Sequence, residues 1–107
     1  MSDYLLIESR DPFDSGCSHY HELACQLAAH GHQVTLFLVQ NAVLITRSCR
    51  FSDQLKEVIN KGVEVLADEF SLQERGINTS ILVEGVKGSP LDKVIDLLAE
   101  GRKVLWH

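Results

Sequence analysis

The sequence predicts an α/β fold: one three-layer domain over residues 1–107, with a mainly parallel five-stranded sheet and helices on both faces. Short apolar segments alternate with segments of helical periodicity along the whole chain, which is the pattern of strand–helix–strand units. The apolar segments are mostly bounded by glycine, and they suit the buried strands of a parallel sheet. A length of 107 residues is close to the usual size of one domain.

The first strand is expected over residues 4–9 (YLLIES), followed by a polar loop and a helix. Ser18 is the expected N-cap of this helix, and Gly31 is expected to end it. Its apolar residues recur at the spacing of one helix face; they are Tyr20, Leu23, Ala24, Leu27 and Ala28. The remaining strands are expected over residues 32–39, 63–67, 80–84 and 103–106.

Helices are also expected between the later strands. One helix is expected over residues 52–62 and another over residues 70–76, and each is expected to end at the glycine that is its last residue. Ser89 as N-cap and Pro90 in the first turn predict the start of the last helix, which ends at Gly101. The buried face expected for this helix consists of Leu91, Val94, Ile95 and Leu98.

Composition and charge exclude several classes of function. The formal net charge of −5 argues against nucleic-acid binding, which needs a basic face. No segment approaches the roughly 20 apolar residues that span a bilayer, and the sequence enters a strand almost at once, so we expect neither membrane insertion nor a signal peptide. Three cysteines are an odd number without a disulfide framework, which favours a reducing cytoplasm.

Cys17 and Cys49 are the candidate catalytic residues. Cys17 lies close to an expected helix start, where the helix dipole favours a thiolate. His19 and His21 follow it and would lower its pKa further if protonated. Cys49 is flanked by two arginines, which favour a thiolate in the same way. The alternative for each is a loop cysteine without a role.

Cys25 falls in the middle of the first helix, next to its apolar stripe, and is expected to be a small core or flanking residue. Cys17, His19 and His21 form a C-x-H-x-H cluster. A structural zinc site needs four ligands, usually from two separated pairs, so we predict no metal site.

Asp68 and Glu69 follow the third expected strand, at the carboxyl edge of the sheet. Paired carboxylates there suit acid–base chemistry or a cation, which leaves open a weaker hypothesis of a small hydrolase or isomerase. The alternative is a solvated loop or a charge at a helix start. The chain has no G-x-G-x-x-G motif, no Walker A loop and no C-x5-R loop, and we predict no cofactor.

Three segments resemble the DsrE/DsrF/DsrH-like family of sulfur-relay proteins, and together they cover nearly the whole chain. They are the opening through residues 24–46 (ACQLAAHGHQVTLFLVQNAVLIT), residues 55–77 (LKEVINKGVEVLADEFSLQERGI) and residues 89–107 (SPLDKVIDLLAEGRKVLWH). The resemblance implies a flavodoxin-like cytoplasmic domain that assembles as trimers or hexamers. Active members of the family carry persulfide sulfur on a cysteine and pass it to partner proteins.

The chain departs from the family at its central residue. The sulfur-carrying cysteine of the family follows the third strand, where this chain has Asp68, Glu69 and Phe70, the candidate binding residues. We therefore predict a sulfur-trafficking protein, either a persulfide carrier that uses Cys17 or Cys49 or an accessory subunit. The alternative is a non-catalytic oligomeric binding or assembly module. For either role, the expected partners of the protein are copies of itself and other sulfur-relay proteins. The apolar residues 34–39 and the short apolar helix over 42–45 support an oligomer, because one side of that helix is expected to contact a partner.

Overall fold

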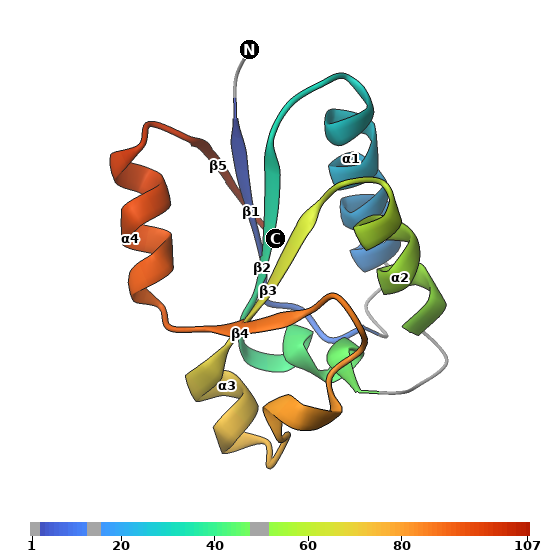
Figure 1. Cartoon of the computed structure of the whole chain (residues 1–107), viewed down its shortest axis with the longest axis vertical. Coiled ribbons are helices and arrows are strands. Elements are labelled where there is room, and N and C mark those ends of the chain that lie inside the picture. Colours follow the sequence, from blue (N-terminus) through green and yellow to red (C-terminus); the bar gives the residue numbers. More distant parts are fainter. Residues whose placement is uncertain (1–2, 13–15, 48–51) are drawn as a thin grey trace.

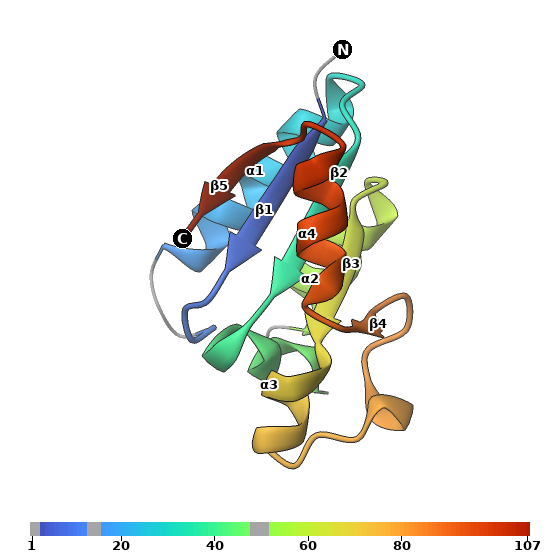
Figure 2. The same ribbon diagram turned by 90° about the vertical axis from the view of Figure 1, so that its left-hand side faces the viewer.

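The computed structural model describes residues 3–12, 16–47 and 52–107. Its sheet has five parallel strands in the order β4-β3-β2-β1-β5, as Figures 1 and 2 show. The predicted parallel α/β sheet is therefore confirmed. The strands are β1 (Tyr4–Glu8), β2 (Val34–Leu38), β3 (Glu64–Asp68), β4 (Lys87–Ser89) and β5 (Lys103–Trp106).

Helices cover both faces of the sheet. The helices α1 (Cys17–Ala29) and α2 (Ser52–Asn60) lie on one face, and α4 (Asp92–Ala99) lies on the other (Figure 1). Successive strand residues point to opposite faces, so the core has two parts. The larger lies under α1 and α2, and the smaller packs Leu97 against Leu5 and Phe37. The remaining helical elements are η1 (Gln40–Thr46), α3 (Glu69–Glu74) and η2 (Thr79–Ile81).

The glycines expected to end helices do so. Gly31 follows α1 with φ +88°, and Gly62 follows α2 with φ +95°. This left-handed backbone is open to glycine without a Cβ penalty. The start of α1 differs from the prediction, because the helix begins at Cys17 with Gly16 as N-cap rather than at Ser18.

The fourth strand was predicted wrongly at residues 80–84. That segment begins in η2, where the Asn78 side chain accepts a hydrogen bond from the Ser80 amide. Val83 is held in the core instead, and its amide donates to the Thr46 carbonyl at 2.8 Å. The real strand, β4, is the polar tripeptide Lys87–Ser89, which pairs with the last residues of β3 at the sheet edge. A three-residue edge strand needs no apolar run, so the pattern could not reveal it.

The last helix also differs from the prediction. Ser89 belongs to β4, and α4 starts at Asp92 after Leu91. The buried residue is Leu97, whereas three residues of the expected buried face are exposed. These are Leu91 at 57%, Ile95 at 63% and Leu98 at 49%. The apolar surface of α4 is thus wider than the part of the helix that packs against the sheet.

The segment over residues 42–45 was predicted as a contact surface for other copies, and this is wrong. Its residues lie in η1, where Val43 and Ile45 are buried within the chain itself. The strand β2 is likewise buried along its whole length. Within the described residues, no helix is long and apolar enough to cross a membrane.

Candidate functional site at the carboxyl edge of the sheet

A cleft of about 460 Å³ lies where the strands end, between α3 and α4. Parallel strands bring their carboxyl ends to one edge, which is the usual ligand position in open α/β sheets. Apolar side chains make up most of the lining, and four of them are largely exposed: Phe70 at 66%, Leu91 at 57%, Ile95 at 63% and Trp106 at 69%. The cleft is lined by Ile7, Val39, Gln40, Asp68, Phe70, Ser71, Glu74, Leu91, Val94, Ile95 and Trp106.

Asp68 lines this cleft, but its carboxylate is engaged in the fold. It is buried and caps α3, accepting hydrogen bonds from the Ser71 amide at 3.1 Å and the Ser71 hydroxyl at 2.7 Å. The Ser71 oxygen accepts in turn from the Gln40 amide at 2.8 Å. Gln40 has φ +52°, a left-handed backbone that is uncommon for a residue other than glycine. Asp68 therefore links β3 and α3 to the turn after β2.

The two neighbours of Asp68 are placed differently. Glu69 is the first residue of α3 and is exposed, so the alternative of a helix-start charge holds for both carboxylates. Glu69 is not among the residues that line the cleft, whereas Phe70 is. Of the three predicted binding residues, Asp68 and Phe70 therefore line this cleft, and Asp68 also acts as a helix cap.

A second group of polar side chains meets at the carboxyl end of β1, and sequence reasoning missed it. Glu8 is only 1% exposed, and its two carboxylate oxygens lie 2.8 and 3.0 Å from Nδ1 of His107. The Arg10 amide donates to the same carboxylate at 2.9 Å. A charged residue at the end of an otherwise apolar strand was the one signal in the sequence. Its partner lies 99 positions away, which no local pattern indicates.

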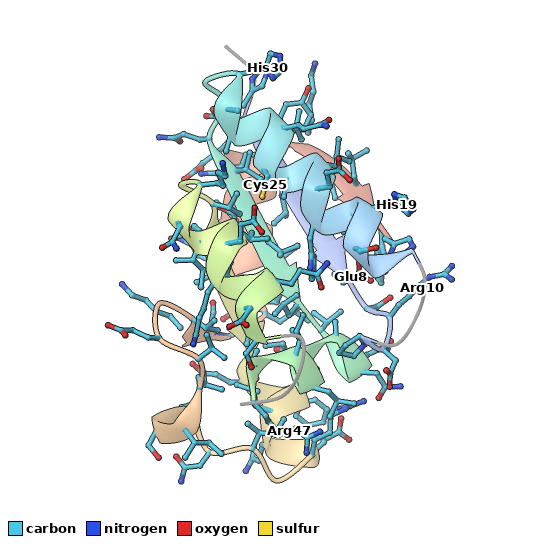
Figure 3. The ribbon with its side chains drawn as sticks, turned by 90° about the vertical axis from the view of Figure 1, so that its right-hand side faces the viewer. Glu8, Arg10, His19, Cys25, His30 and Arg47 are labelled. Carbon is cyan, nitrogen blue, oxygen red and sulfur yellow. The ribbon has the colours of Figure 1, made fainter. Side chains whose placement is uncertain are left out.

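Tyr20 on α1 is the third member of this group. Its ring stacks on the His107 imidazole with the ring centres 5.1 Å apart, and its hydroxyl donates to the Leu105 carbonyl. Burial and the nearby Glu8 carboxylate raise the pKa of Tyr20. Figure 3 shows Glu8 close to the first turns of α1. The tyrosine therefore stays neutral and fixes the imidazole against the helix.

His21 has no part in activating a thiol by positive charge, contrary to the expectation from the sequence. It is 3% exposed, and burial lowers its pKa to about 4, although a hydrogen bond with Gln54 opposes this shift. Its Nδ1 atom is buried without a hydrogen-bond partner. At neutral pH this imidazole is therefore uncharged. His19, by contrast, is exposed to solvent (Figure 3).

The three cysteines have different positions. Cys17 is the first residue of α1, and Cys49 lies outside the described residues. Cys25 packs at the flank of the larger core, as expected, and its pKa is raised by burial and by Glu57. Within residues 3–12, 16–47 and 52–107, no group of three or more potential ligands could hold a metal ion.

The comparison with protein-family models identifies the chain. A model described as the DsrE/DsrF-like family matches residues 3–107. The chain belongs to the DsrE/DsrF-like family. No curated protein matches it. Membership of this family points to a role related to sulfur relay.

Solved structures share the fold along their whole length. The ychN protein from E. coli has a TM-score of 0.90 at 22% identity, with 100% of both chains covered. MTH1491 from Methanobacterium thermoautotrophicum, a protein of unknown function, has a TM-score of 0.85 at 17% identity, covering 99% of this chain and 100% of its own. BT1422 from Bacteroides thetaiotaomicron, also of unknown function, has a TM-score of 0.81 at 19% identity, covering 98% and 95%. At these identities the similarity establishes the fold alone.

Proposed function

We propose that this DsrE/DsrF-like protein takes part in sulfur trafficking, as a persulfide carrier or as an accessory subunit of a relay. The observation that carries the proposal is the match of the family model to residues 3–107. Three cysteines, an odd number without a disulfide framework in the sequence, fit a reducing cytoplasm, the setting we infer for it. Its partners would be other sulfur-relay proteins and further copies of the chain.

A carrier role requires a nucleophilic thiolate that a donor can reach. The family position after the third strand holds Asp68, a capping carboxylate that cannot store sulfur. Cys25 is disfavoured because burial and Glu57 raise its pKa. The carrier hypothesis therefore depends on Cys17 or Cys49.

Mass spectrometry after incubation with a persulfide donor tests this proposal. A carrier gains the mass of one sulfur atom, and reduction with a thiol removes it. Cys17→Ser and Cys49→Ser assign the position, and Cys25→Ser is the matched control that should keep full loading. A chain that gains no sulfur, alone or with a relay partner, and binds no such partner would overturn the sulfur-trafficking proposal.

The second candidate is a non-catalytic oligomeric binding or assembly module. The exposed apolar residues of α4, together with Phe70 and Trp106 at the cleft rim, favour it. Contiguous exposed apolar surface commonly marks an interaction site. We expect light scattering to show an oligomer, a trimer or a hexamer by family resemblance, and a stable monomer at micromolar concentration would contradict this.

A further inference from the structure

A pocket of about 370 Å³ lies between α1 and α2, on the face of the sheet opposite to α4 (Figure 1). Small-molecule sites commonly have volumes of about 300–1,000 Å³, so the pocket can hold a small ligand. Residues three or four positions apart share one face of a helix, and each helix contributes such a set to the wall. The lining includes His21, Glu22 and Cys25 from α1, and Gln54, Glu57 and Val58 from α2.

His21 brings a hydrogen-bond acceptor that the fold leaves unused. Its side chain is 3% exposed, and burial keeps the imidazole neutral by lowering its pKa to about 4. Nδ1 has no hydrogen-bond partner in the described part of the chain. The hydrogen bond with Gln54, which raises the pKa of His21, therefore comes from Nε2 as donor. Nδ1 carries the lone pair, and a buried acceptor without a donor costs free energy that an occupant with an N–H group would recover.

Two carboxylates border the same pocket from different helices. Burial, Glu57 and Glu22 raise the pKa of the Cys25 thiol, which places both carboxylates near that side chain. Cys25 itself lies on the side of α1 that faces α2 (Figure 3). Lys61 opposes the shift, but this lysine does not line the pocket. Among the residues that the structure describes, no hydrogen bond or ion pair engages either carboxylate, so the pocket has negative charge without a bound counter-charge.

We propose that this pocket binds a small organic cation with a primary ammonium group. An ammonium has three N–H donors, and the pocket offers three acceptors: Glu22 on α1, Glu57 on α2 and Nδ1 of His21 in the interior. Hydrogen bonds from an ammonium to carboxylates are charge-assisted and therefore strong. The alkyl chain of the cation contacts Val58 and the neutral Cys25 thiol. Glu22 and Glu57 are long exposed side chains, so they can adjust around the occupant.

The same acceptors distinguish a primary ammonium from other cations. A quaternary ammonium has the charge but no N–H group, so it cannot donate to Nδ1 of His21 or to the carboxylates. A metal ion is disfavoured, because no group of three or more potential ligands within the described residues could hold one. The pocket is separate from the cleft between α3 and α4, and the proposal therefore does not depend on a role in sulfur trafficking.

Titration of the full chain with butylammonium at pH 7 and low salt, followed by proton–nitrogen correlation NMR, tests this site. We expect saturable shifts confined to the amides of α1 and α2. Tetramethylammonium should bind at least about tenfold more weakly, because it has no N–H donor. Glu57→Gln should weaken butylammonium binding about threefold or more. The matched control is Asp96→Asn, which removes an exposed carboxylate of α4 and should change the affinity less than about 1.5-fold.

His21→Phe keeps a buried ring but removes the acceptor, and it should weaken butylammonium binding about fivefold. If that variant loses its far-UV circular dichroism, the nitrogen signals of His21 in the unaltered protein decide instead: the Nδ1 signal should move during the titration and the Nε2 signal should not. A lack of saturable shifts, equal affinity for tetramethylammonium, or unchanged affinity in Glu57→Gln overturns the proposal. Unchanged affinity in His21→Phe, or a constant Nδ1 signal, shows that water alone serves His21 and also overturns it.

Discussion

Replacing Asp68 tests whether the carboxylate at the end of β3 stabilises the fold. In Asp68→Ala the amide at the start of α3 loses its cap, which costs about 0.5–2 kcal/mol. The buried Ser71 hydroxyl also loses the carboxylate that accepts its hydrogen, while its oxygen still accepts the Gln40 amide. A buried donor left without an acceptor costs about 1 kcal/mol or more. We expect a total loss of about 2 kcal/mol in the free energy of unfolding, or roughly 10 °C in Tm for a chain of this size.

Urea unfolding at one protein concentration measures this change, and the midpoint should fall by roughly 1 M. Two controls come from the same site. Asp68→Asn keeps an efficient cap and should recover most of the stability, whereas Glu69→Ala alters an exposed side chain and should stay within about 0.5 kcal/mol. Equal midpoints for Asp68→Ala and Glu69→Ala would refute the reasoning.

Two further predictions concern a buried imidazole and the exposed apolar residues of α4. The pKa of His21 falls from an ordinary 6.5 to about 4 on folding, so the unfolded chain binds the extra proton between these values. The free energy of unfolding therefore decreases as pH falls from 6.5 to 4, by up to about 3 kcal/mol. His21→Gln should flatten this part of a plot of urea midpoint against pH. If the plots for His21→Gln and His19→Gln have equal slopes, the assignment is contradicted. Ile95→Lys should shift the oligomer toward monomer in light scattering because it places a charge on the exposed apolar side of α4. Asp96→Lys changes an exposed neighbour and should leave the oligomer unchanged. Equal effects of Ile95→Lys and Asp96→Lys on the oligomer would show that the apolar side of α4 is not the interface.

Prediction of α4 shows why burial is harder to predict than periodicity. The apolar spacing identified a helix in the right place, and α4 ends at the expected glycine. The same spacing assigned Ile95 and Leu98 to the core, although only Leu97 is buried. A stripe of apolar residues is the same whether it faces the sheet or another molecule, so the pattern alone cannot distinguish the two.

The two polar groups at the sheet edge were not equally predictable. Asp68 is the last residue of an apolar strand and directly precedes a helix, and both of its hydrogen bonds come from a residue three positions away. Such local geometry can be predicted from sequence. The hydrogen bond from Gln40 to Ser71 joins residues 31 positions apart, and no local pattern indicates it.

The sequence by itself determined the α/β class, the parallel sheet and the glycine ends of the helices, because these depend on periodicity and backbone freedom over a few residues. It also determined the family, through segments spread along the whole chain. Only the tertiary structure decided that Glu8 meets His107 across 99 positions and that His21 is buried and uncharged at neutral pH. These contacts depend on which strands become neighbours, β1 beside β5 above all. The order of the strands depends on how the whole chain packs, and no short segment of the sequence indicates it.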